Sequence, residues 1–267
     1  MEFKNIIKEH IQWRSQIFKL AEADLKKTYN GAALGWAWAI IKPTITIFIY
    51  WFAFSMGFRE KAGIADYPFF LWLVAGIISW FYIQEMWIGG PSSMRTYRFL
   101  ITKMKFPTST IPTFYSLSRM VTHLFLLVIV FIIYLFAGYG VSIYYIQIPF
   151  YMLCMYLLMT GWCLFAGVVG AMSRDFSNLV KSFSMALFWL SGIMIPISNI
   201  KNDIAQAFFM LNPVTYIVEG YRNCFVHHKW FFEEPVLMAI FFVEVVVMWA
   251  MAVATFSKLK KEMPDVL

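Results

Sequence analysis

Residues 235–256 read PVLMAIFFVEVVVMWAMAVATF, and Glu244 is the only charged side chain among them. Lys258, Lys260 and Lys261 follow almost at once. A hydrocarbon core of about 30 Å is crossed by about 20 apolar residues in a helix. Because the backbone must satisfy its own hydrogen bonds in lipid, a helix is the form that a single run of this length takes. The run therefore predicts a membrane-spanning helix.

Five further runs of this kind precede it. The 267-residue chain is 61% hydrophobic and 20% aromatic, and its mean hydropathy is +0.66. These values exceed those of ordinary soluble domains. The sequence predicts an all-α polytopic membrane protein in which an N-terminal segment, 1–30, precedes a single six-helix transmembrane domain, 31–267. The six expected spans are Trp36–Phe58, Phe69–Gly90, Ile111–Ala137, Ile143–Met172, Leu179–Ile197 and Pro235–Phe256.

Lys and Arg are distributed unevenly about these spans. Of 22 such residues, 16 lie before or at the start of the first span, in the second and fourth connections and in the tail, and five lie on the opposite side. Basic residues are enriched in the cytoplasmic loops of membrane proteins, so both termini are expected in the cytoplasm. The net charge of +7 then follows from topology, and no nucleic-acid partner is expected.

Residues 3–27 have the pattern of an amphipathic helix. One arc carries Phe3, Ile7, Ile11, Phe18, Ala21 and Leu25, and the opposite face carries Lys4, Lys8, Lys19 and Lys26. Such a helix suits the cytoplasmic membrane surface. It equally suits the cytoplasmic edge of the protein itself, and the two positions are compatible.

Two cytoplasmic connections could dock a soluble partner. Residues 91–107 lie between two prolines, carry four cations and no acid, and predict a short helix capped by Ser92 or Ser93. A solvated loop is the alternative. Residues 173–178 predict a single helical turn at the same surface.

Three ionisable residues fall inside spans, where each needs a partner or a polar cavity. Glu85 and Arg119 lie in adjacent spans at similar depth, which predicts an ion pair that fixes two helices; a substrate contact or a gate is the alternative. Glu244 has no sequence partner and is expected to face a polar cavity or a neighbouring copy. With only His123 besides these, proton coupling is not expected.

Residues 198–234 predict a helical hairpin that dips into the outer leaflet. Asn212 and Pro213 form a typical helix start, Tyr216 follows in the same helix, and Glu219 and Arg222 are spaced to pair. A lid of interfacial helices without a transport role is the alternative. His227 and His228 are expected to be interfacial polar residues, and the three cysteines small apolar ones, so no metal site is expected.

Motifs of catalysis are missing from the sequence. It contains no G-x-x-x-x-G-K-[ST], G-x-S-x-G or H-E-x-x-H motif. The chain is therefore expected not to be an enzyme by itself and to need an outside motor. A membrane enzyme acting on polyprenyl lipids remains the alternative from another class.

Several motifs in fixed order carry a family resemblance. They are Gly35-Trp-Ala-Trp-Ala-Ile-Ile-Lys-Pro43, Lys103-Met-Lys-Phe-Pro107, Ser173-Arg-Asp-Phe176 and Asn212-Pro-Val-Thr-Tyr-Ile-Val-Glu-Gly-Tyr-Arg-Asn223. In this order the chain resembles the polysaccharide-export permeases of ABC transporters, and most closely the teichoic acid branch of Gram-positive bacteria.

This resemblance implies a homodimer in the bacterial plasma membrane, paired with two separate ATP-binding cassette subunits. Those subunits would hold ATP and magnesium, and this chain would hold no cofactor. Residues implied to touch the ATPase are Ser93, Arg95, Tyr97, Arg98, Phe99, Arg174, Asp175 and Phe176.

The implied cargo is wall teichoic acid on a polyprenyl diphosphate lipid. Another lipid-linked glycan, such as O-antigen or capsule, is the near alternative, and a drug or small-lipid exporter comes third. Lys42 is expected to attract the diphosphate or anionic membrane lipids. The aromatic residues expected along the path are Trp36, Trp38, Trp72, Trp80, Tyr82 and Trp87.

Overall fold

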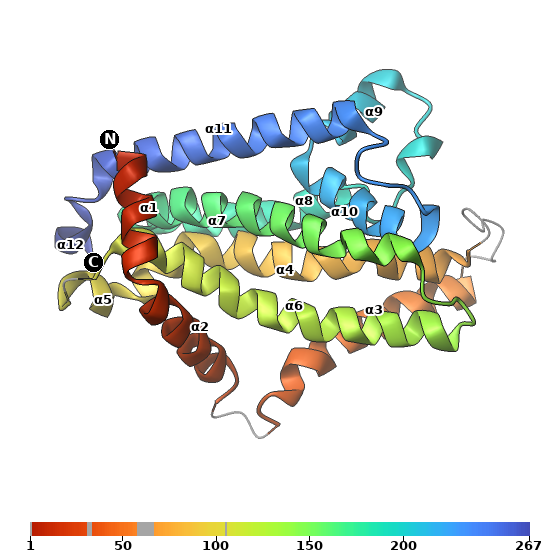
Figure 1. Cartoon of the computed structure of the whole chain (residues 1–267), viewed down its shortest axis with the longest axis horizontal. Coiled ribbons are helices and arrows are strands. Elements are labelled where there is room, and N and C mark those ends of the chain that lie inside the picture. Colours follow the sequence, from red (N-terminus) through yellow and green to blue (C-terminus); the bar gives the residue numbers. More distant parts are fainter. Residues whose placement is uncertain (1, 31–33, 58–66, 105) are drawn as a thin grey trace.

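The computed structural model describes residues 2–30, 34–57, 67–104 and 106–267. Its elements form an elongated helical bundle with both termini at one end (Figure 1). In chain order they are α1 (Glu2–Gln12), α2 (Arg14–Tyr29), α3 (Ala37–Gly57), α4 (Phe69–Thr96), α5 (Arg98–Thr102), η1 (Thr108–Thr110), α6 (Ile111–Phe136), η2 (Ile143–Gln147), α7 (Ile148–Met172), α8 (Arg174–Trp189), η3 (Ile197–Asn199), α9 (Asp203–Met210), α10 (Pro213–Arg222), η4 (Asn223–His227), α11 (Pro235–Leu259) and α12 (Met263–Val266).

The expected all-α membrane fold is confirmed. Within the described ranges, five helical stretches are long and apolar enough to cross a bilayer. They are Gly35–Ala53, Phe69–Thr102, Thr108–Phe136, Ile143–Met172 and Pro235–Leu259. Four of them extend or match expected spans, and the first covers most of Trp36–Phe58, whose last residue lies outside the described residues.

The expected span Leu179–Ile197 is not one continuous helix. The helix observed in this region, α8, begins earlier, at Arg174, and ends at Trp189. Gly192 then adopts a left-handed φ of 65°. The expected turn over 173–178 is simply the start of this helix. Arg222 accounts for the early end, because its guanidinium donates hydrogen bonds to the carbonyls of Gly192 and Ile193 at 2.8 and 2.6 Å. These carbonyls are thus satisfied outside a helix, as a low-dielectric environment requires.

The centre of the bundle is α4, which packs against α6, α7, α8 and α10. It is much more buried than α3 and α11, which line the periphery (Figure 1). The approach of α7 to α4 depends on small residues. A Cβ on Gly170 would lie only 1.9 Å from the Pro91 carbonyl oxygen.

Pro91 does not end α4, contrary to the expected proline-bounded helix over 91–107. Since proline lacks an N–H, it leaves the carbonyl of Trp87 without its helical donor. The indole N–H of Trp162 points to that oxygen at 3.4 Å, so α4 continues to Thr96. Ser92 and Ser93 are therefore inside a helix and do not cap one, and their hydroxyls donate to carbonyls of the preceding turn.

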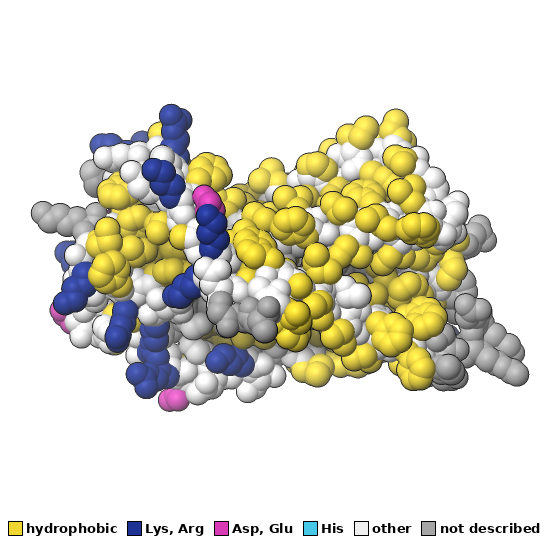
Figure 2. Space-filling model, turned by 90° about the horizontal axis from the view of Figure 1, so that it is seen from below, with side chains coloured by type: hydrophobic (Ala, Val, Ile, Leu, Met, Phe, Trp, Pro, Cys, Tyr) yellow, Lys and Arg dark blue, Asp and Glu magenta, His cyan; other side chains and the backbone are white. Residues whose placement is uncertain are grey.

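Basic side chains gather at the end that holds both termini, called the basic end below; the opposite end is the distal end. Figure 2 shows most of the visible Lys and Arg at the basic end, while hydrophobic side chains dominate the remainder of that face. This separation matches the charge asymmetry of the sequence and the pattern of a protein that crosses a membrane several times.

The N-terminal segment forms two helices and not one. The chain bends at Trp13, whose ring contacts Phe106 edge-on at 5.3 Å. Both helices contact α6 at different heights: His10 bonds to Thr113 at 2.6 Å, and Tyr29 bonds to Thr122 at 3.3 Å. The buried apolar positions are Ile6, Ile17, Ala21 and Leu25, and the exposed ones are Phe3, Ile7, Ile11 and Phe18. The segment thus packs on the bundle and also presents an apolar face outward.

Candidate functional site

A cavity of about 930 Å³ lies among α2, α3, α4, α6 and α8. This volume is near the upper end of small-molecule sites. Both α3 and α8 border it and carry exposed apolar side chains elsewhere on their surfaces, including Phe48, Trp51, Phe183 and Trp189. The cavity therefore lies next to an apolar surface of the bundle.

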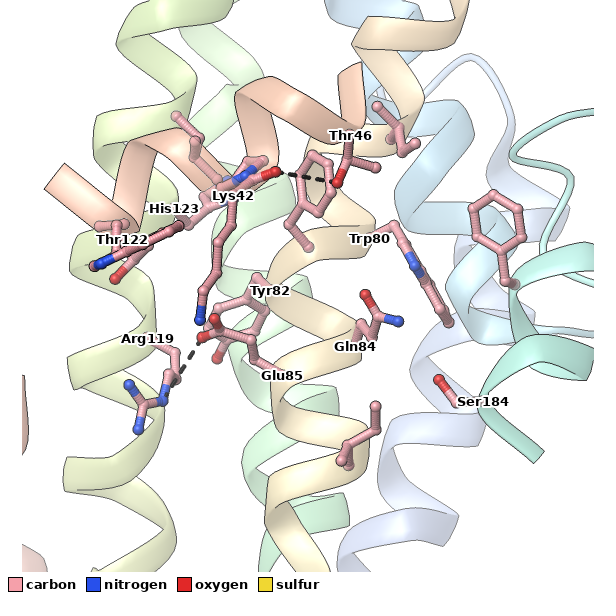
Figure 3. A pocket seen from close by; sticks show the side chains of 18 of the residues that line it. Lys42, Thr46, Trp80, Tyr82, Gln84, Glu85, Arg119, Thr122, His123 and Ser184 are labelled. Atoms are coloured by element: carbon pink, nitrogen blue, oxygen red, sulfur yellow. Dashed lines mark hydrogen bonds and ion pairs between the residues drawn. The ribbon is translucent and has the colours of Figure 1, made fainter. Parts of the chain in front are cut away.

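Charged side chains occupy the part of the cavity nearer the basic end. Lys42 from α3 extends toward Glu85 of α4, and Arg119 of α6 approaches the same carboxylate (Figure 3). The Arg119 Nε lies 3.7 Å from a Glu85 oxygen. Lys181 from α8 also lines the cavity. Three cations and one acid thus share a site inside a helical bundle, where each charge is expensive unless paired or wet.

Arg119 has a second and more buried partner, which the sequence analysis missed. Its Nη2 lies 3.3 Å from a carboxylate oxygen of Asp24 in α2, and the side chain of Asp24 is only 5% exposed, against 49% for Glu85. The Arg119 Nη1 also donates to the Thr28 hydroxyl at 3.0 Å. Asp24 in turn accepts a hydrogen bond from the hydroxyl of Tyr97. The expected pair of Glu85 and Arg119 is thus one arm of a network that ties α2 to α6 and to the end of α4.

Aromatic rings line both parts of the cavity: Tyr29 and Trp38 lie beside the cations, and a second group of rings lies nearer the distal end. Phe188 of α8 lies between Trp80, at a ring distance of 5.4 Å, and Tyr50, at 6.4 Å with the rings nearly parallel. Tyr82 lines the cavity, and its hydroxyl shares a hydrogen bond with the hydroxyl of Ser116. Tyr50 and Phe188 were missed from sequence, as was Lys181, because they become one wall only when α3 and α8 meet.

The expected path residues separate into two groups. Trp38, Lys42, Trp80 and Tyr82 line the cavity together. The other three aromatics lie elsewhere: Trp36 contacts Tyr29 at 5.2 Å, Trp87 stacks on Trp162 at 4.2 Å, and Trp72 lies beneath Arg222.

The expected coupling residues lie at the basic end but differ in exposure. Arg98, Phe99, Arg174 and Asp175 are exposed, with Phe99 at 61%. Phe176 is half-buried. The others hold the structure together: Ser93 is buried in α4, Arg95 donates to the carbonyl of Ala171 at 2.9 Å, and Tyr97 bonds to Asp24. Lys105 of the same segment lies outside the described residues.

The distal hairpin has the expected helix start. The Asn212 side chain accepts from the backbone N–H of Val214 at 3.0 Å, and Pro213 begins α10. Arg222, fully buried, pairs with Glu219 at 2.6 Å and lies 3.4 Å from the ring centre of Trp72. By contrast, Ile204 and Phe208 of α9, and Leu211 directly after it, are exposed.

The remaining ionisable residues and the cysteines lie in separate parts of the described structure. No group of three or more His, Cys, Asp or Glu side chains that could hold a metal ion occurs among the described residues. His228 contacts Tyr67 at 2.9 Å and Ser142 at 3.1 Å, and joins distal loops. The cysteines are buried and free, and Glu244 lies half-buried on α11.

A bundle of apolar helices around a large charged and aromatic cavity is the architecture of a multi-pass membrane protein. Residues 15–226 match the family of ABC-2 type transporters, and the chain belongs to this family. It is also 24% identical over 261 residues to the O-antigen export system permease protein RfbA of Myxococcus xanthus, an alignment that covers 97% of this chain and 98% of that protein.

Proposed function

We propose that this chain is the membrane subunit of an ATP-driven exporter that moves a lipid-linked polysaccharide across the plasma membrane. The observation that carries the proposal is the division of the large cavity into a charged part and an aromatic part. Lys42, Glu85, Arg119 and Lys181 lie toward the basic end, and Tyr50, Trp80 and Phe188 lie toward the distal end.

This division suits the two ends of a glycolipid. A diphosphate head group is anionic and is attracted by clustered Lys and Arg. The flat apolar faces of sugar rings suit aromatic walls. Glu85 offsets part of this positive charge until an anion arrives, and the Arg119 guanidinium can then bind a phosphate oxygen in place of the half-exposed carboxylate.

The basic end is then cytoplasmic and the distal end outer. A homodimer would bring the exposed apolar residues of α3 and α8 against a second copy and close the cavity into a path. Two ATPase subunits, which would hold ATP and magnesium, would dock on the exposed residues Arg98, Phe99, Arg174 and Asp175. No cofactor is assigned to this chain.

The finer identity of the cargo rests on two different indications. The motif resemblance favours wall teichoic acid, an anionic polymer, whereas the relative from Myxococcus xanthus is named for O-antigen export. Both polymers are carried on a polyprenyl lipid, so both fit the proposed head-group site.

The test is the ATPase rate of the complex in liposomes. The chain would be co-expressed with its ATPase subunit and titrated with polyprenyl-diphosphate teichoic acid and, separately, with a polyprenyl-diphosphate O-antigen. Stimulation by one of them, weakened in Lys42→Gln and Lys181→Gln, is the expected result. Lys201→Gln, which removes an exposed cation at the distal end, is the matched control. A folded chain that forms no complex with the ATPase, or a complex that neither lipid stimulates, would overturn the proposal.

A further inference from the structure

A second cavity, of about 270 Å³, lies near the distal end among α4, α7, α9, α10, η4 and α11. It shares no lining residue with the large cavity, although α4 borders both. Its volume is just below the range of about 300–1,000 Å³ typical of small-molecule sites, so it suits a ligand with a single ring.

Two residues that line this cavity carry hydroxyl groups without partners among the described residues. Thr215 and Tyr216 line it, are 3% and 8% exposed, and have no hydrogen-bond partner for their hydroxyls among the described residues. A buried polar group without a partner costs roughly 1–3 kcal/mol. Such groups are uncommon in native structures and call for an explanation. Both oxygens are themselves shielded from solvent, so a ligand with its own hydroxyls would satisfy them after a small rotation of each side chain.

The charges around the cavity are balanced within the protein. Glu219 is held by Arg222 at 2.6 Å, and Glu234 lies 3.4 Å from Lys229. Burial lowers the pKa of the His227 imidazole below its usual value, which keeps the ring neutral at neutral pH. The lining therefore offers no surplus charge to a diphosphate or a metal ion. It offers neutral donors and acceptors, including the amides of Gln206 and Asn223.

Aromatic rings complete the lining. Trp72, Tyr151 and Tyr216 contribute to it, and the ring of Tyr216 is held in place by stacking on Phe241 at 4.7 Å. Flat apolar faces beside neutral hydrogen-bonding groups match a sugar ring, which carries C–H groups on its faces and hydroxyls around its edge.

We infer that the distal cavity binds a neutral saccharide ring of the exported glycan after it has crossed the membrane. The identity of the glycan in this inference rests on the proposed function, whereas the preference for a neutral ring rests on the lining residues. A saccharide held at the distal end resists return into the path, so the site would favour outward movement.

The test uses two variants that remove only the hydroxyls without partners, Tyr216→Phe and Thr215→Val. Tyr145→Phe is the matched control, because Tyr145 lies at the distal end outside this cavity and its hydroxyl contacts the carbonyl of Gly140 at 3.5 Å. The permease–ATPase complex in nanodiscs would be titrated with N-acetylglucosamine and with delipidated oligosaccharides of the surface polymer, followed by saturation-transfer NMR. Inorganic diphosphate would serve as the anionic competitor.

We expect saccharide binding that each variant weakens about fivefold, the loss of one neutral hydrogen bond, with no change in Tyr145→Phe and no competition by diphosphate. Thermal stability of Tyr216→Phe should equal or exceed that of the parent, which shows that the variant is folded. Absence of saccharide binding by the parent, or equal binding by all four proteins, would overturn the inference.

The ATPase measurement separates this failure from failure of the proposed function. Stimulation by a lipid-linked polymer without saccharide binding in the distal cavity would refute the site alone. Saccharide binding that depends on Tyr216, in a complex that no lipid-linked polymer stimulates, would refute the export function alone.

Discussion

Replacing Arg119 by methionine should lower the stability of the protein far more than replacing Glu85 by glutamine. The structure explains the difference through exposure. Arg119→Met leaves Asp24, which is 5% exposed, as a buried charge without its cation at 3.3 Å. Removing one partner of a buried pair costs about 3–5 kcal/mol.

Glu85→Gln removes a partner that is 49% exposed and 3.7 Å away. Such a pair contributes about 0–1 kcal/mol. The double variant Arg119→Met/Asp24→Asn should recover most of the loss, because it leaves no buried charge alone and the asparagine oxygen can still accept from Tyr97.

The assay is thermal unfolding in nanodiscs, followed by tryptophan fluorescence. In a chain of this size 1 kcal/mol shifts Tm by about 2–4 °C, so Arg119→Met should lower Tm by roughly 6–20 °C and Glu85→Gln by at most a few degrees. Equal losses in the two single variants, or no recovery in the double variant, would refute the conclusion that Asp24 is the main partner of Arg119.

Three further outcomes are expected. Arg222→Met should destabilise the distal hairpin by about 3–5 kcal/mol, because it leaves Glu219 and two backbone carbonyls without their donor; faster hydrogen exchange over 190–222, partly corrected by adding Glu219→Gln, would support this, and unchanged exchange would contradict it. The lowered pKa of His227 means that the unfolded chain takes up the proton first as pH falls below about 6.5, so stability present above that pH should decline below it. His227→Gln should flatten this dependence of Tm on pH relative to the parent, and identical slopes would count against it; the charged groups acting on His227 are Glu219, Arg222, Lys229 and Glu234. Arg98→Glu should reduce lipid-stimulated ATPase activity at least tenfold while Tm is unchanged, since Arg98 is exposed, and normal stimulation would exclude it from the ATPase contact.

Local signals were sufficient for most of the helices. Apolar length located the spans, and Asn212 followed by Pro213 located the start of α10. The pair of Glu219 and Arg222 followed from helical spacing alone. In each case the information lies within one or two turns of the chain.

Features that depend on distant residues could not be predicted. The early end of α8 depends on Arg222, which lies about 30 residues beyond the carbonyls that it binds. The partnership of Asp24 and Arg119 joins α2 to α6. In the sequence Asp24 is one acid within the amphipathic segment 3–27, and nothing local distinguishes it from a solvated residue.

The continuation of α4 through Pro91 also depends on a distant residue. Proline and serine together indicate a helix start when read locally. The indole of Trp162, from another helix, supplies the donor that proline lacks. This tertiary contact lets α4 continue past Pro91, where the local sequence predicts a helix start.

The N-terminal helices are synthesised first but acquire their partners late. Glu9 and His10 bond to Ser109 and Thr113, about one hundred residues further on, and Glu2 pairs with Lys260, 258 residues away. While a ribosome is still producing α3 and α4, this segment has nothing to dock against, and its last contact must await release of the tail. A chain that stops before α6 therefore keeps a loose amino terminus, whereas one that stops between α6 and Lys260 lacks only the contacts with α11 and the tail. Membrane proteases that engage loose ends would act mainly on the earlier truncations.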